Sequence, residues 1–148
     1  MKKLALAVLI IALFAVGYIY RGYFMPIRDI DRLGPKEIVQ TYYGRLAAHD
    51  FINANRCLSE DYLRERSKPN SVAQTPLWLG DIEISKGIDT KASGYLSDNY
   101  AERLFDVEYN ATFLQAGGSV DGHQLDFVYV AKKTKDSPWR IIGIGCGP

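Results

Sequence analysis

The N-terminal apolar run constrains this chain more than any other feature. Residues Leu4 to Tyr20 are uncharged and mostly apolar, Lys2 and Lys3 precede them, and Arg21 ends the run. As a helix, such a run extends about 25 Å, near the roughly 30 Å hydrocarbon core of a bilayer. A buried core helix is disfavoured because the run has no polar face. We therefore expect one N-terminal transmembrane helix within residues 1–24, with residues 4–20 in the membrane.

The flanking residues predict which side of the membrane the rest of the chain occupies. Lys2 and Lys3 should remain in the cytoplasm, so the C-terminal part is expected to be extracytoplasmic. Tyr18 and Tyr20 lie at the other end of the run, where aromatic rings favour the membrane interface. A cleaved secretory signal is the alternative, because Ala15-Val16-Gly17 resembles a small-x-small cleavage site. The protein would then be secreted.

Charge and cysteine content reduce the range of functions that are possible for the remaining sequence. The chain has 148 residues; without the three basic residues that flank the run, 15 Lys and Arg face 17 Asp and Glu. A near-neutral domain without a basic stripe is a poor nucleic-acid binder, so we expect no nucleic-acid partner. Cys57 and Cys146 show no metal-ligand spacing, and we expect no metal and no cofactor. Outside the cytoplasm the two cysteines could form a disulfide, or they could be separate thiols.

Residues 25–33 form a short linker, and three helices are predicted after it. Pro35 suits the first turn of a helix whose Val39, Tyr42 and Tyr43 share one apolar face. Asp50 is a good N-cap for a second short helix, and Ser59 for a third that runs to about Arg66.

Alternating patterns then predict strands. Leu77 to Ile88 is a first strand, Arg103 to Phe113 a second, a third is centred on Leu125 to Ala131, and Trp139 to Ile144 is the last. We expect the core-facing side chains to be those listed next: Phe105, Val107, Tyr109, Ala111 and Phe113 on the second strand, and Leu125, Phe127, Tyr129 and Ala131 on the third. The opposite side of both strands should face water or a partner, as in an antiparallel sheet with one wet face.

Helices followed by antiparallel strands predict an α+β domain over residues 34–148, with a curved sheet around the helix that starts at Pro35. The segment "GPKEIVQTYYGRLAAHDFINANRCLSEDY" and the ending "PWRIIGIGCGP" resemble the nuclear-transport-factor-2-like (cystatin-like) superfamily. The nearest resemblance is to a bacterial family of unknown function that follows lipoprotein signals or single membrane anchors. This resemblance implies a cone-shaped fold. It implies no particular chemistry, because the superfamily includes enzymes, transport factors and adaptor modules.

Two candidate sites follow from this fold. The side chains expected to line a pocket between sheet and helix are Tyr42, Tyr43, His49, Tyr109 and Tyr129. The residues expected on an interaction face of the sheet are Leu104, Asp106, Glu108, Val128 and Val130. A buried tyrosine beside a carboxyl group could polarise a carbonyl, but the expected core positions contain no acid.

The missing catalytic set favours a noncatalytic function. We expect a membrane-anchored extracytoplasmic module that binds another envelope protein or a second copy of itself, in the latter case through the sheet. An isomerase- or dehydratase-like enzyme acting on a small apolar ligand is one alternative. A cleaved and secreted ligand-binding domain is another.

Overall fold

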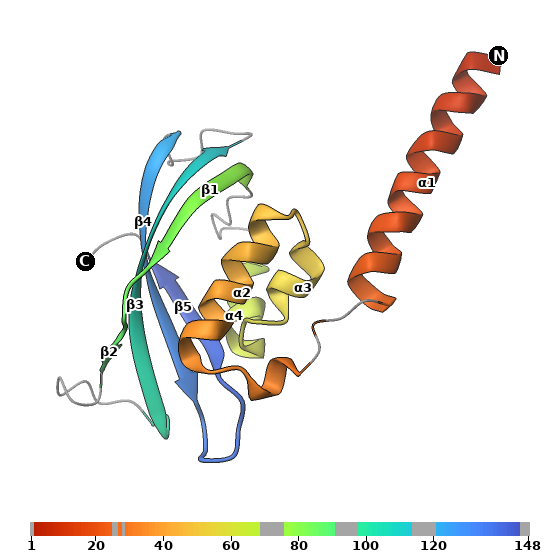
Figure 1. Cartoon of the computed structure of the whole chain (residues 1–148). Coiled ribbons are helices and arrows are strands. Elements are labelled where there is room, and N and C mark those ends of the chain that lie inside the picture. The colour runs from red at the N-terminus through yellow and green to blue at the C-terminus, as the bar shows by residue number, and fades with distance from the viewer. Residues whose placement is uncertain are drawn as a thin grey trace.

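The computed structural model describes residues 2–24, 27, 29–68, 76–90, 98–113 and 121–145. Its first element is the helix α1 (Lys2–Phe24), which extends away from the rest of the molecule in Figure 1. The apolar side chains described on α1, such as Leu9 and Phe14, are exposed. Among the described residues, no helix meets the length and apolar character needed to cross a membrane.

Three further helices confirm the predicted starts. A 3-10 turn (η1, Ile30–Arg32) leads into α2 (Pro35–Ala47), where the Glu37 carboxylate accepts a hydrogen bond from the Gly34 N–H. In α3 (Phe51–Asn55) the Asp50 side chain caps the helix by accepting from the Asn53 N–H. In α4 (Glu60–Arg66) the Ser59 hydroxyl accepts from the Tyr62 N–H. Each cap satisfies a backbone N–H that has no partner inside its helix.

The described strands form a five-stranded antiparallel open sheet, so the α+β class is confirmed. Its order is β1-β3-β4-β5, and the short β2 pairs with β3 beyond the end of β1. The bounds of the strands are β1 Pro76–Ile84, β2 Ile88–Asp89, β3 Ala101–Phe113, β4 Gly122–Lys132 and β5 Arg140–Gly145. In Figure 1, α2, α3 and α4 all lie on one side of this bent sheet.

The first predicted strand is divided by Gly87. This residue has φ 78°, a left-handed backbone conformation that residues other than glycine rarely adopt. A Cβ atom placed on Gly87 would lie 2.4 Å from Cε1 of Phe105, so the backbone passes directly over a core ring. The backbone at Gly87 therefore turns between β1 and β2.

The core lies between α2 and the inner side of β3 and β4. On β3 the predicted inward residues are confirmed, because Phe105, Val107, Tyr109 and Ala111 are buried. Ile38, Val39, Tyr42 and Tyr43 meet them from α2, and the other buried apolar residues are Ala54, Cys57, Leu58, Leu79, Val128, Val130 and Ile141.

The prediction for β4 is wrong by one residue of alternation from Leu125 to Tyr129, whereas Ala131, from the same predicted set, is buried. Asp126, Val128 and Val130 are buried, whereas Leu125 is 41% exposed and Phe127 is half-buried on the other side. Residues that lie directly opposite each other in antiparallel strands share a face, and Asp126 pairs with Val107 of the inner side. Both alternating sets on β4 contain large apolar side chains, so hydrophobicity alone did not determine which set faces the core.

Backbone contacts from the helical region cover part of the β5 edge. The Ser59 N–H donates to the Ile141 carbonyl (2.8 Å), and the Ile141 N–H donates to the Cys57 carbonyl (2.9 Å). Further along, the Ile144 N–H donates to the Tyr62 hydroxyl at 3.1 Å. Strand edges with unpaired backbone groups attract other chains, and this edge is therefore partly protected.

Candidate functional site

The inner side of the sheet carries a buried cluster of tyrosines around one carboxylate. The Tyr43 hydroxyl donates to Oδ2 of Asp126 at 2.6 Å, and the Tyr109 hydroxyl donates to the same oxygen at 3.0 Å. Tyr43 comes from α2, Tyr109 from β3 and Asp126 from β4. The rings of Tyr42 and Tyr43 meet edge to face at 5.2 Å, and those of Tyr43 and Tyr109 lie 5.4 Å apart. Three elements thus converge on a single carboxylate.

Burial and charge determine the protonation of this cluster. Burial raises the pKa of Asp126, while the hydrogen bonds from Tyr43 and Tyr109 and the charge of Arg66 oppose that change. Burial, and then the negative charge of Asp126, raises the pKa of Tyr43 well above its usual value. Tyr43 is therefore protonated at neutral pH and acts as a donor, whereas Asp126 accepts a proton more readily than an ordinary aspartate.

Arg66 adds a cation next to the cluster. Its Nη1 donates to the Tyr42 hydroxyl at 2.8 Å, from the last turn of α4. Burial raises the pKa of Tyr42, although Arg66 partly offsets this effect. The cluster thus contains a cation, protonated phenols and a carboxyl group, which is a set able to bind and polarise a carbonyl or hydroxyl group.

The residues expected to line a pocket do not all meet at this cluster. Tyr42, Tyr43 and Tyr109 do, packed against one another and around Asp126. His49 is exposed beyond the end of α2, where its ring lies 5.9 Å from that of Phe51. Tyr129 lies on the opposite side of the sheet, directly across from Gly143 of β5, as a consequence of the reversed alternation of β4.

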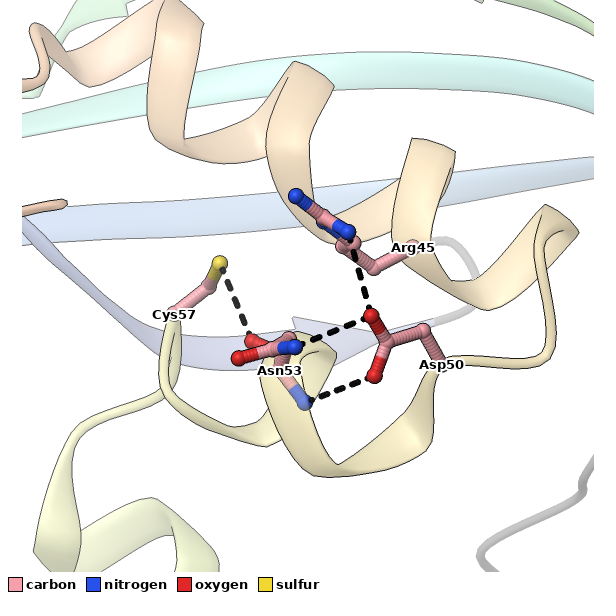
Figure 2. Close-up of polar contacts among 4 residues, drawn as sticks. All are labelled: Arg45, Asp50, Asn53 and Cys57. Carbon is pink, nitrogen blue, oxygen red and sulfur yellow. Dashed lines mark hydrogen bonds and ion pairs between the residues drawn. The ribbon is translucent and has the colours of Figure 1, made fainter. Parts of the chain in front are cut away.

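A second buried network stabilises the junction of α2 and α3 (Figure 2). Oδ2 of Asp50 accepts from Nη1 of Arg45 at 3.1 Å and from Nδ2 of Asn53 at 2.9 Å. The Cys57 thiol lies 3.9 Å from the Asn53 carbonyl oxygen. Asp50 is 3% exposed, and its carboxylate needs these donors because an unpaired buried charge is costly. We assign this network a structural role.

Cys57 is a buried and unreactive thiol in this arrangement. Burial raises its pKa to about 12, so almost none of it is the nucleophilic thiolate at neutral pH. The sequence left a disulfide with Cys146 and two separate thiols as alternatives, and neither is tested because Cys146 lies outside the described residues.

The side of the sheet away from the helices forms a second candidate site. We define the outer sheet face by its residues: Trp78, Gly80 and Glu83 of β1; Leu104, Asp106, Glu108 and Asn110 of β3; and His123, Leu125, Phe127 and Tyr129 of β4. Of the predicted interaction residues, Leu104, Asp106 and Glu108 belong to this face. Val128 and Val130 do not, because they are buried in the core.

The sequence pattern missed Asp126 and Arg66 as members of the inner cluster. Asp126 was assigned to the wet side of β4, and Arg66 is far from both strands in sequence. One signal could have identified Asp126. Asp126 stands between Leu125 and Phe127 and alternates with Val128 and Val130. An aspartate at such a position needs donors if it is buried, and the tyrosines of α2 and β3 are such donors.

The fold and the inner cluster together define an α+β domain in which a helix with two tyrosines covers one side of an antiparallel sheet. A family model described as "Domain of unknown function (DUF4829)" matches residues 36–145, and the chain belongs to this family. Neither the curated proteins nor the solved structures include a match to this chain.

Proposed function

We propose that this protein is a membrane-anchored, extracytoplasmic domain of the nuclear-transport-factor-2-like superfamily that binds an envelope protein, or a second copy of itself, through the outer sheet face. The observation that carries the proposal is the apolar character of this face on β4. Leu125 is 41% exposed, and Phe127 and Tyr129 are half-buried beside it. Contiguous apolar side chains at a surface favour protein association.

The position of the helices supports this choice. In Figure 1, α2, α3 and α4 lie on the opposite side of the sheet from this face. The inner side also contributes most of the core, so the inner residues are already occupied by packing. The superfamily assignment is supported by the same arrangement, in which α2 packs against β1, β4 and β5 on one side of a bent antiparallel sheet.

The membrane anchor is supported by the uncharged run of residues 4–20 and by the Lys2-Lys3 pair before it. The exposed apolar side chains of α1, including Leu9 and Phe14, fit a lipid environment better than water. A full-length mass in the membrane fraction of the native host is the expected result. A mass that begins near Tyr18, recovered from the medium, would instead support the secreted form.

Site-specific photo-crosslinking tests the binding surface. A photoreactive amino acid replaces Phe127 on the outer sheet face, and a matched variant carries it at Glu65, an exposed position on α4. Crosslinking is performed on the full chain in native membranes. We expect a discrete protein adduct from position 127 and none from position 65. Equal yields at both positions would contradict the proposed surface.

A small-ligand function is the second candidate, and the Asp126 cluster is the observation that favours it. A carboxyl group with a raised pKa beside two phenol donors resembles the acid and base arrangement of enzymes that act next to a carbonyl. A thermal-shift screen with small cyclic ketones and phenols on the full chain tests this function. A compound that stabilises the wild-type protein but not Asp126→Asn would support it, and a screen without such a compound would count against it.

A further inference from the structure

The outer sheet face is divided lengthwise into an acidic half and an apolar half. On β3, the outward residues Asp106 and Glu108 follow one another along the strand. On β1, Glu83 lies directly opposite Glu108. Like charges that face each other across strands destabilise a sheet, and a cation placed between them removes that repulsion. Glu108 already contacts one outward ring, because its Oε2 lies 3.2 Å from Nε2 of His123. Between Leu104 and Thr112 on β3, and between His123 and Tyr129 on β4, no described outward residue is Lys or Arg.

The apolar half lies on β4, and β5 places two glycines beside it. Leu125 lies beside Glu108, and Phe127 lies beside Asp106. On the other side of β4, Gly145 and Gly143 are opposite Phe127 and Tyr129. Glycine has no side chain, so both rings are left uncovered toward β5. A ligand that lies across this face therefore meets carboxylates on one flank and aromatic rings on the other.

An exposed indole extends the acidic half along β1. The Trp78 ring lies against Gly80, because a Cβ atom on Gly80 would be only 2.6 Å from Cζ2 of Trp78. Trp78 remains 52% exposed in this position. Next to Gly80, Asp81 has a left-handed φ of 52° and accepts a hydrogen bond from Nδ2 of Asn110 at 3.0 Å. An exposed indole on the same face as the carboxylates of β1 and β3 is a favourable site for a Lys or Arg side chain.

We infer that the outer sheet face binds a basic amphipathic segment of a partner protein, with its apolar residues on β4 and its Lys or Arg residues on the carboxylates of β3 and β1. This inference rests on the proposed function and specifies the chemistry of its partner. Adjacent strands are about 4.8 Å apart and a helix is about 10 Å wide, so one helix or strand spans both halves.

The same charges disfavour two other occupants. A second copy that presents the same face would bring Glu83, Asp106 and Glu108 against their own equivalents, which repel. An anionic lipid surface would be repelled for the same reason. The acidic half therefore selects a cationic protein segment over both.

Crosslinking in a charge-reversed background tests this inference. The photoreactive amino acid is placed at Leu125 in the full chain in native membranes, either alone or with Glu83→Lys and Glu108→Lys. Glu65→Lys on α4 is the matched control, since it reverses one exposed charge away from this face. We expect the double reversal to lower the adduct yield about tenfold or more, and added salt to lower it in the wild type, because surface charge pairs are screened. The control should leave the yield unchanged, and the crosslinked partner peptide should carry Lys or Arg.

Each outcome separates this inference from the proposed function. An adduct whose yield is unaffected by the double reversal would leave the proposed surface intact and overturn the cationic partner. An adduct with a second copy or with lipid would also overturn it. The absence of any adduct from Leu125 and Phe127 would overturn both. As the decisive positive result, reversal of the Lys or Arg residues of the partner peptide to Glu should restore the adduct in the double-reversal background.

Discussion

Removal of the Tyr43 hydroxyl should destabilise the protein in a pH-dependent manner. Tyr43→Phe keeps the ring and deletes the 2.6 Å hydrogen bond to Asp126. A hydrogen bond to a charged group contributes about 1.5–3 kcal/mol to stability, and one between neutral groups about 0.5–1.5 kcal/mol. The variant should therefore lose about 1.5–3 kcal/mol of unfolding free energy at a pH at which Asp126 is ionised. It should lose about 1 kcal/mol less at a pH at which Asp126 is protonated.

The direction of this change follows from the pKa of Asp126. Burial raises that pKa in the folded protein above the ordinary aspartate value of 3.8, and the Tyr43 hydrogen bond partly counteracts the rise. A raised carboxyl pKa means that the associated stability is fully present below the unfolded pKa and is lost as the pH rises through the folded pKa. Without the Tyr43 hydrogen bond, the pKa of Asp126 in the folded protein rises further. As the pH rises from below the unfolded pKa, the variant therefore loses more stability than the wild type does.

Urea denaturation of the full chain at pH 7 and at a pH below 3.8, followed by tryptophan fluorescence, measures the effect. Tyr109→Phe removes the longer 3.0 Å bond and should show the same pH dependence with a smaller amplitude. Tyr42→Phe is the matched control, because the Tyr42 hydroxyl accepts from Arg66 and the hydroxyls that donate to the carboxylate are those of Tyr43 and Tyr109. The stability cost of Tyr42→Phe should be the same at both pH values. Equal costs of Tyr43→Phe at both pH values would refute the reasoning.

Three other substitutions or modifications have clear expectations. Gly87→Ala should lower the unfolding free energy by about 2–4 kcal/mol, because it combines a left-handed φ with a clash against buried Phe105. Gly122→Ala has a positive φ but no neighbour within 4 Å and should cost less in the same denaturation assay; equal costs would argue against the clash. Cys57 should resist iodoacetamide in the folded protein and react after unfolding, since its pKa is about 12; peptide mass mapping would show rapid native labelling if this is wrong. Asp50→Ala should cost about 2 kcal/mol by loss of the α3 cap and of a partly buried ion pair, whereas Asp50→Asn keeps the cap and should cost less when melting temperatures are compared.

The helical part of the fold could be predicted from local signals. Pro35, Asp50 and Ser59 mark helix starts through the backbone groups that they satisfy or do not need, and these effects depend on only a few neighbouring residues. The strand β3 was equally predictable, because its apolar side chains apart from Leu104 lie on one side. Such signals are independent of the rest of the molecule.

The inner cluster could not be predicted in the same way. Its centre, Asp126, is polar, and its inward direction depends on the pairing with Val107 of β3. That pairing depends in turn on which rings α2 places over the sheet, and this is a property of the assembled fold. The same shift of one residue moved Val128 and Val130 from the predicted interaction face into the core and moved Phe127 and Tyr129 outward. The β3 carboxylates of the acidic half were nevertheless predictable, since Asp106 and Glu108 alternate with core residues of β3.

The hydrogen bonds that cover the β5 edge also have a kinetic consequence. Tyr62 and Ile144 are 82 positions apart, so their contact closes a long loop. Contacts between distant residues form late and slow the folding of a domain. A chain that has been synthesised or translocated only as far as β4 therefore presents the unpaired edge of β4 and the open carbonyl of Cys57. During that interval it is a substrate for chaperones and proteases, and it becomes resistant to them only when β5 docks.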